Sequence, residues 1–199
     1  MAYFIESETY IEQTFRRRSV TREALNRLEF EDCIFEQCDF SESIFTHCKF
    51  IDCTFKDCNL SLINMQSTRW FGVQFFECKL VGVDWTTADW PPFHLDSELS
   101  FERCILNDGS FFGLTLQGLR LVECKCHDMD FREGDFSHST LIDNDFSHSV
   151  FMRTNLQSCD FTGSSNFNIH LLENTLDNAK FSRFEALTLL YSLNIELVD

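Results

Sequence analysis

Ten cysteines and two serine-histidine-serine runs are the residues whose types could do chemistry in this chain. Cysteine can bind metal, form disulfides or act as a nucleophile, and the run Cys-Lys-Cys-His at 124–127 has the residue types of a zinc site. The Ser-His-Ser runs at 137–139 and 147–149 place a hydroxyl beside an imidazole, as a nucleophile and its general base would require. Whether these groups can act together depends on the elements that carry them.

An apolar residue recurs at every fifth position along almost the whole chain. The first run of these residues is Phe30, Phe35, Phe40, Phe45, Phe50, Phe55, Leu60, Met65, Trp70, Phe75, Leu80, Trp85 and Trp90. The spacing resumes one residue out of phase from Phe101 to Phe161, and a shorter run continues through Leu171, Leu176 and Phe181. A period of five fits neither the 3.6 of a helix nor the 2 of a strand. It indicates a stacked repeat, in which no unit can bury its apolar face alone.

The cysteines follow the same period. Cys126 occupies a central position, and the other nine occupy a small site two residues before a central position: Cys33, Cys38, Cys48, Cys53, Cys58, Cys78, Cys104, Cys124 and Cys159. One large and one small inward position in every five residues suit a tight square coil. Because free cysteine behaves as a small buried hydrophobe, this register predicts core packing rather than disulfides or metal binding. Both thiols of the 124–127 run should point inward, and His127 should point outward.

The two Ser-His-Ser runs do not converge in such a coil. His138 and His148 are two pentapeptides apart, which places them on opposite faces of a four-sided coil. Ser139 and Ser149 take the small inward site. Because no set of side chains meets in a pocket, we expect no catalytic residues, no metal site and no cofactor, and we predict that the protein is not an enzyme.

The repeat motif resembles that of the pentapeptide-repeat family. It stands as Cys-Ile-Phe-Glu-Gln at 33–37, Cys-Asp-Phe-Ser-Glu at 38–42 and Asn-Asp-Phe-Ser-His at 144–148. The resemblance covers roughly residues 15–181. It implies an all-β fold, a right-handed quadrilateral β-helix with four pentapeptides in each coil.

We predict a single domain with five parts. These are an N-terminal cap at 1–14, a first rod segment at 15–90, an interruption at 91–100, a second rod segment at 101–181 and a C-terminal module at 182–199. Both prolines of the chain fall in the interruption, and proline cannot donate to a strand ladder, so a loop should leave the rod there. The residues of this loop are Pro91, Pro92, Phe93, His94, Asp96 and Glu98.

The C-terminal module is predicted to contain a short helix and a short strand. Ser182 and Glu185 have the spacing of a capping box, and residues 195–198 alternate like a strand. The helix is apolar on more than one side, so it either folds onto the last coil or forms a dimer seam, and the second is favoured. The seam residues would be Phe184, Leu187, Leu190, Tyr191, Leu193, Ile195 and Leu197.

The chain is strongly acidic, with 32 acidic against 16 basic residues and a formal net charge of −16. Such a surface repels nucleic acid and attracts basic partners. No stretch approaches the ~18 apolar residues of a membrane span, and no signal peptide is recognised, so a cytoplasmic protein is expected. Residues twenty apart should lie one above another, which stacks like charges at a cost in stability that a basic partner would relieve. The stacked pairs are Asp57 with Glu77, Asp108 with Asp128, and Glu123 with Asp143.

Residues 182–199 also resemble the C-terminal dimerisation module of the pentapeptide proteins that protect type II topoisomerases, the Qnr-like branch. Residues 100–108 and 192–197 are most similar to the pentapeptide proteins that give resistance to albicidin, a gyrase poison. The resemblance implies a homodimeric DNA mimic that binds DNA gyrase or topoisomerase IV and confers resistance to a poison such as albicidin or a quinolone. It also implies that the six stacked carboxylates contact the enzyme and that the loop at 91–98 lies near the drug.

Two other functions stay open. The negative charge could simply keep the rod soluble, in a structural or scaffold protein that binds another partner. That partner would then contact apolar residues at outward positions, namely Phe71, Phe76, Phe112, Ile142 and Met152. Alternatively, the protein could bind or modify a drug directly, without a topoisomerase.

Overall fold

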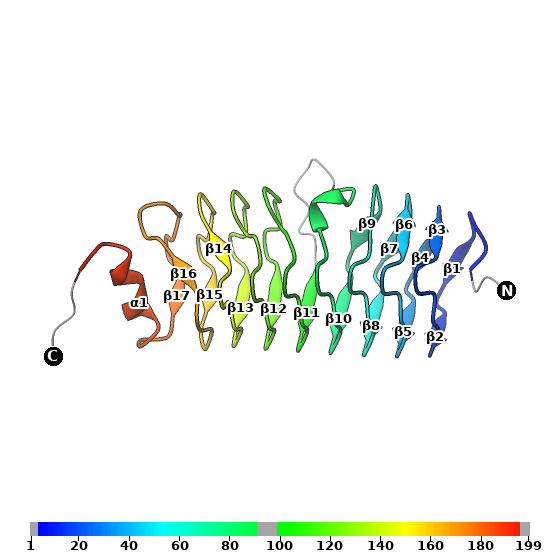
Figure 1. Ribbon diagram of the computed structural model, residues 1–199, viewed down its shortest axis with the longest axis horizontal. Helices are drawn as coiled ribbons and strands as arrows, with labels where there is room; N and C mark the ends of the chain where they lie inside the picture. The colour runs from blue at the N-terminus through cyan, green and yellow to red at the C-terminus, as the bar shows by residue number, and fades with distance from the viewer. Residues whose placement is uncertain (1–3, 91–98, 196–199) are drawn as a thin grey trace.

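The computed structural model describes residues 4–90 and 99–195. The described chain winds into a rod of stacked coils, with its two ends at opposite ends of the rod (Figure 1). Each coil contributes to four faces, numbered here in the order in which the chain visits them after residue 13. All strand pairings are parallel, as the stacking of successive coils requires. The predicted all-β solenoid is therefore confirmed.

Face 1 is a nine-stranded sheet that runs the length of the rod. Its strands are β2 (Thr14–Arg16), β5 (Ile34–Glu36), β8 (Thr54–Lys56), β10 (Gln74–Phe76), β11 (Ser100–Glu102), β12 (Arg120–Val122), β13 (Thr140–Ile142), β15 (Asp160–Phe161) and β17 (Lys180–Phe181). Neighbouring strands lie about 4.8 Å apart, so nine of them span a rod of about 38 Å.

The other three faces carry shorter ladders. Face 2 is joined by single bridges from Ser19 to Ser165. Face 3 carries β3 (Ala24–Asn26), β6 (Ile44–Thr46), β14 (Val150–Phe151) and β16 (Asn168–Ile169), and face 4 carries β1 (Thr9–Ile11), β4 (Glu29–Glu31), β7 (Lys49–Ile51) and β9 (Arg69–Phe71). A 3₁₀-helix, η1 (Trp85–Thr87), and one α-helix, α1 (Ala186–Tyr191), complete the elements.

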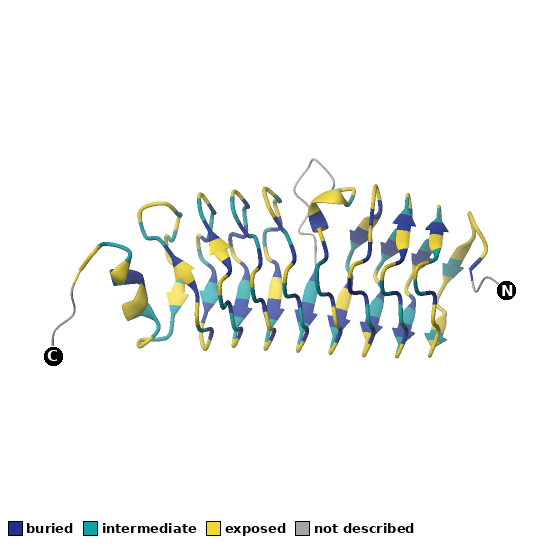
Figure 2. Cartoon of the chain, viewed as in Figure 1, coloured by how far each residue is buried: buried dark blue, intermediate teal, exposed yellow. Residues whose placement is uncertain are grey.

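The core contains the residues that the period of five selected. Successive coils stack Phe35 on Phe55, Phe55 on Phe75 and Phe75 on Phe101, with ring centroids 4.5, 5.1 and 4.9 Å apart. All ten cysteines fall within the described residues, and each is buried with a free thiol. Figure 2 shows buried residues recurring along the strands of successive coils, with exposed residues at many of the turns. The predicted core packing of the cysteines is confirmed.

The interruption changes the register of the rod by six residues. Before it, paired residues are twenty apart, as Thr54 and Gln74 are, whereas across it Gln74 pairs with Ser100. Twenty-residue spacing returns afterwards, with Ser100 paired to Arg120. The six predicted loop residues lie outside the described part of the chain.

The rod begins inside the segment for which the sequence predicted a separate cap. Strand β1 pairs in register with β4, so residues 9–11 already belong to the first coil. Phe4, 5% exposed, then covers the end of the core and packs its ring against Tyr10, Phe15 and Phe30. This aromatic contact shields the first coil, which would otherwise leave an open edge.

The C-terminal helix lacks the predicted capping box. Ser182 Oγ accepts a hydrogen bond from the Gly163 N–H at 2.8 Å, and Glu185 occupies the N-cap position without a side-chain capping bond. Residues 196–199, most of the predicted strand, lie outside the described residues. None of the helices in the described part of the chain has the length and apolarity that crossing a membrane requires.

Candidate partner-binding face

The buried thiols are structural groups. Burial raises the pKa of the Cys53 and Cys159 thiols to about 12, so both stay protonated at neutral pH. In one interior column the N–H of Cys38 donates to Cys58 Sγ at 3.3 Å, and the N–H of Cys58 donates to Cys78 Sγ at 3.4 Å. A buried protonated thiol is a poor nucleophile and a poor metal ligand.

The residues of the 124–127 run point in different directions, as predicted. Cys124 and Cys126 are buried, whereas the half-buried His127 places Nε2 2.8 Å from Asp145 Oδ2. Burial alone would raise the pKa of Asp145, but hydrogen bonds from Asn166, Ser147 and His127 hold it below its usual range. These contacts fix the turn and direct His127 away from the two thiols.

The Ser-His-Ser runs do not form a nucleophile and base either. His148 Nδ1 lies 3.7 Å from Asp128 Oδ1, on the surface. Ser149 is buried, and its hydroxyl donates a hydrogen bond to the Cys126 carbonyl. Imidazole and hydroxyl therefore face opposite sides of the coil wall.

The six predicted carboxylates all lie along the two edges of face 2. Each is exposed, and each occupies the corner of a coil with a positive φ, between +50° and +60°. Corner N–H groups donate to the coil above or below: Asp57 to the Phe76 carbonyl, and Asp108 to the His127 carbonyl. This bonding aligns the corners of successive coils into straight rows.

We name the two rows by their edges. Row A borders faces 1 and 2 and contains Arg17, Gln37, Asp57, Glu77, Arg103, Glu123 and Asp143. Row B borders faces 2 and 3 and contains Arg22, Glu42, Leu62, Gly82, Asp108, Asp128 and His148. The three predicted carboxylate pairs stack within these rows. Their role in binding a partner stays a prediction.

Before the interruption, ion pairs and hydrogen bonds between coils occupy much of the two rows. Arg22 makes two hydrogen bonds to Glu42, at 2.8 and 2.9 Å. Arg103 lies directly after Glu77 in row A and pairs with it at 3.0 Å. Sequence reasoning missed this pair, because it depends on the six-residue shift at the interruption.

After the interruption the carboxylates are less compensated. Among the described residues, no lysine or arginine makes an ion pair with Asp108, Glu123 or Asp143. In the same described part of the chain, the only ion-pair partner of Asp128 is the neighbouring imidazole of His148. This part of face 2 therefore carries four carboxylates that no lysine or arginine pairs with among the described residues.

The C-terminal end of the rod exposes apolar side chains. Phe184 is 82% exposed and Tyr191 61%, while Leu187 and Ile195 are each 45% exposed. Leu190 and Leu193 are half-buried, and Leu197 lies outside the described residues. Leu189, one of the residues that make the helix apolar on more than one side, is the helix residue that is buried against the rod. The helix therefore packs by one side chain and leaves an apolar surface beside it.

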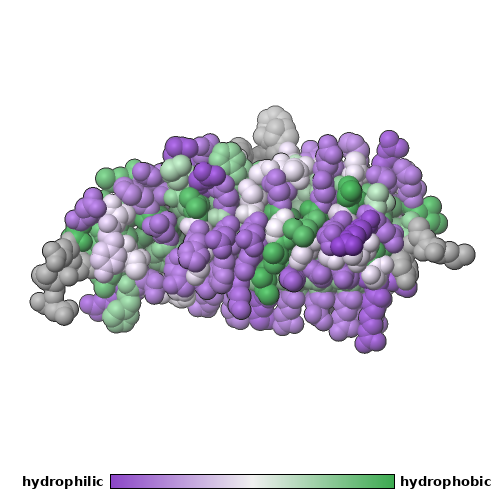
Figure 3. All heavy atoms as spheres, in the orientation of Figure 1, coloured by the Kyte–Doolittle hydropathy of each residue, from purple (hydrophilic) through white to green (hydrophobic). Residues whose placement is uncertain are grey.

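The apolar residues named for the rival function are scattered. Phe112 is 41% exposed, and the Arg132 guanidinium lies 5.5 Å from its ring centroid. Phe71, Phe76, Ile142 and Met152 are half-buried. In the view of Figure 3, hydrophilic residues cover most of the surface and apolar residues gather in separate patches.

Comparison with known families gives a consistent assignment. A model described as pentapeptide repeat region matches residues 28–99, and a model of eight pentapeptide repeats matches residues 130–165. Together they cover more than half of the chain. The chain belongs to the pentapeptide-repeat family. No curated protein matches this pentapeptide-repeat sequence.

Solved structures of QnrB1, described as a plasmid-mediated fluoroquinolone resistance protein, share the fold. A trypsin-treated variant aligns with a TM-score of 0.72 at 18% identity, covering 96% of this pentapeptide-repeat protein and 100% of QnrB1. Full-length QnrB1 aligns with a TM-score of 0.61 at 21% identity, covering 94% and 100% of the two chains. At these identities the likeness shows the fold alone. The similarity to albicidin-resistance proteins stays a prediction.

Proposed function

We propose that this protein binds a type II topoisomerase, DNA gyrase or topoisomerase IV, in place of DNA. By doing so it confers resistance to a topoisomerase poison of the albicidin or quinolone class. The observation that carries the proposal is the pair of carboxylate rows along the edges of face 2. The likeness in fold to a fluoroquinolone resistance protein supports the choice of partner.

The spacing of the rows suits a surface that normally holds a duplex. Corners repeat every ~4.8 Å along the rod, so two fully acidic rows present one carboxylate per ~2.4 Å. Duplex DNA presents one phosphate charge per ~1.7 Å of its axis. A row of three extended residues separates the two edges by about 10 Å. Where both rows are acidic, at Asp108, Glu123, Asp128 and Asp143, face 2 therefore approaches the charge density of DNA.

The exposed apolar surface at the C-terminal end supports a homodimer. Two rods joined end to end through Phe184, Leu187 and Tyr191 would bury side chains that a monomer leaves in water. Such a dimer would double the length of the rod to about 76 Å, using the strand spacing of about 4.8 Å. The partner enzyme would place the protein in the cytoplasm.

The test is DNA supercoiling by purified gyrase, and decatenation by topoisomerase IV, with increasing amounts of this protein. Each reaction is run with no drug, with albicidin and with a fluoroquinolone. We expect inhibition of the enzyme, restored activity in the presence of one of the drugs, or both. No effect in any condition, from folded protein at micromolar concentration, would contradict the proposal.

Salt dependence separates this function from the scaffold function. Binding through exposed carboxylates weakens as ionic strength rises, because counterions screen the charges. Binding through apolar residues such as Phe112 would be insensitive to salt. We expect the affinity for the topoisomerase to fall steeply between low and physiological salt.

A further inference from the structure

The coil that contains β16 departs from the spacing of its neighbours. Val150 pairs with Asn168, eighteen residues on, whereas Asn155 on the next face pairs with Thr175, twenty residues on. Compared with the neighbouring coils, the segment before β16 is therefore two residues shorter and the segment after β16 is two residues longer. The additional residues enlarge the turn at 170–174, at the corner between faces 3 and 4.

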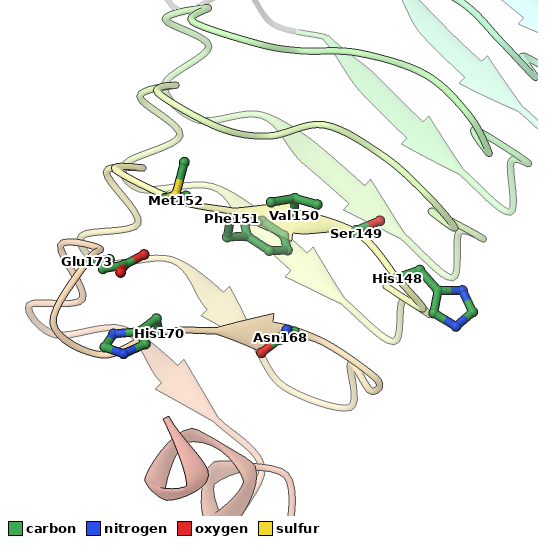
Figure 4. A pocket seen from close by; sticks show the side chains of 8 residues that line it. All are labelled: His148, Ser149, Val150, Phe151, Met152, Asn168, His170 and Glu173. Atoms are coloured by element: carbon green, nitrogen blue, oxygen red, sulfur yellow. The ribbon is translucent and has the colours of Figure 1, made fainter. Parts of the chain in front are cut away.

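A cavity of about 300 Å³ opens between β14 and this turn. Val150, Phe151 and Met152 give it an apolar wall, and Asn168, His170 and Glu173 give it polar groups. Figure 4 shows His170 and Glu173 at one end of the cavity and His148 at the other. The cavity thus combines an apolar surface with a carboxylate at one end.

The carboxylate of Glu173 is not neutralised by the side chains around it. Among the described residues, no basic side chain lies within 4.0 Å of it. Arg153 bonds to Glu173 only through the backbone, with its N–H 2.9 Å from the Glu173 carbonyl, and its guanidinium is engaged by Glu133. His170 Nδ1 accepts the Leu172 N–H at 3.2 Å, so this nitrogen is occupied within the turn.

These groups suit a side chain with an aliphatic stem and a cationic head. Lysine and arginine both pack such a stem along apolar surface while the charged group at its end stays in a polar environment. Arginine fits better, because its planar guanidinium can donate two parallel hydrogen bonds to one carboxylate. The cavity also adjoins row B, because His148, which follows Asp108 and Asp128 in that row, lines it. A basic partner surface that binds row B would therefore lie next to the opening of the cavity.

We propose that this cavity receives an arginine side chain of a partner protein. The guanidinium pairs with Glu173, and the stem packs against Val150 and Met152. The identity of the partner rests on the proposed function, under which it is the topoisomerase. The cavity extends the contact from the carboxylate rows around the corner onto face 3.

The first experiment tests the cavity without any topoisomerase. N-acetyl-arginine methylamide is titrated into the full chain while amide NMR shifts are recorded, with the matching citrulline compound as the uncharged control probe. We expect saturable shifts at 148–152 and 168–173 with the arginine probe and not with the citrulline probe. Glu173→Gln should weaken this binding at least about fivefold, whereas the same change at the exposed Glu31 should leave it unchanged. Absence of saturable shifts, equal binding of both probes, or wild-type binding by Glu173→Gln overturns the proposal.

The second experiment measures affinity for the topoisomerase. Glu173→Gln should weaken binding about tenfold, and Glu31→Gln should bind as wild type does. Equal affinity of the two variants overturns the proposal while leaving the proposed function intact. If wild type itself binds no topoisomerase, the proposed function fails, and the arginine probe alone decides whether the cavity takes arginine.

Discussion

The two rod segments share one fold but differ in how their surface charges are matched. Residues 15–90 carry twelve acidic and nine basic residues, whereas residues 101–181 carry twelve acidic and six basic residues. In the first segment cations such as Arg16 and Arg22 pair with the coil above, at 2.6 and 2.8 Å. In the second, Asp108, Glu123 and Asp143 have no such partner among the described residues. Stacking of the coils therefore does not require the carboxylates to be neutralised.

The cores of the segments differ as well. On face 1 the stacked rings run from Phe15 to Phe101, and leucines replace them at 121 and 141. Offset stacking adds to the free energy gained by burying apolar area. The first segment therefore has the more strongly cohesive core, and the second has the surface that suits a partner.

The largest expected effect is on the stability of the first core. Phe55→Ala should lower the free energy of unfolding by about 3–5 kcal/mol, because Phe55 is fully buried between Phe35 and Phe75. Leu141→Ala in the second segment should cost about 1 kcal/mol less, since Leu141 lies between Leu121 and Phe161 and, being aliphatic, makes no ring-stacking contact. Urea denaturation monitored by circular dichroism measures both. An equal or larger loss of unfolding free energy for Leu141→Ala would show that the core of the first segment is not the more cohesive one.

The next effect concerns binding rather than stability. Reversing Asp108, Asp128 and Asp143 to lysine should weaken topoisomerase binding at least about 100-fold, or about 3 kcal/mol. Reversing Glu12, Asp32 and Asp52, which are exposed corner residues between faces 4 and 1 near the N-terminal end of the rod, should change it less than about threefold. Titration calorimetry gives the affinities, and circular dichroism confirms that both triple variants fold. Similar losses for the two variants would show that net charge, rather than the two rows, governs binding.

Removing an aromatic side chain should also have different effects at the two ends of the rod. Phe4→Ala should lower the free energy of unfolding by about 2 kcal/mol, because its buried ring contacts three others. Phe184→Ala should leave the stability of the monomer unchanged, because its side chain is 82% exposed, but should shift a dimer toward monomer. Denaturation and sedimentation equilibrium separate the effects. A dimer unaffected by Phe184→Ala would exclude this surface as the seam.

The smallest expected effect is a pH dependence located in the second segment. Hydrogen bonds hold the pKa of Asp145 below its ordinary value of 3.8, so its ionised form stabilises the fold above that pH. This contribution is lost as pH falls below 3.8 through the lower folded-state pKa. Asp145→Asn should therefore lower the urea midpoint at neutral pH, and the difference from wild type should shrink in acid. Glu42→Gln, which breaks an exposed pair in the first segment, should have almost no effect.

The repeat spacing was sufficient to predict the fold and most of its core. The central residues and the small cysteine sites are buried because a period of five leaves two inward positions in each side of the coil. The cap boundary at residue 15 was too late, because Tyr10 continues the period and is half-buried at the centre of β1. The predicted capping box does not form, because Ser182 Oγ instead accepts a hydrogen bond from the Gly163 N–H. This contact between coils cannot be read from the local spacing of residues.

The candidate site was predictable only within each segment. Residues twenty apart stack, so Asp108 with Asp128 and Glu123 with Asp143 followed from the period. The complete order of row A could not be predicted from the period, because the six-residue shift at the interruption places Arg103 after Glu77. The cavity beside β16 likewise depends on a register change of two residues, and the break in the apolar spacing after Phe161 does not give the size of that change.

The most direct test of the account is competition between this protein and DNA for gyrase. A fluorescent duplex is bound to the enzyme, and its anisotropy is followed as the protein is added at fixed salt. We expect wild-type protein to displace the duplex, and we expect no displacement by the variant with Asp108, Asp128 and Asp143 changed to lysine. Simultaneous binding of protein and duplex, or equal displacement by the variant, would contradict the claim that the carboxylate rows take the place of DNA.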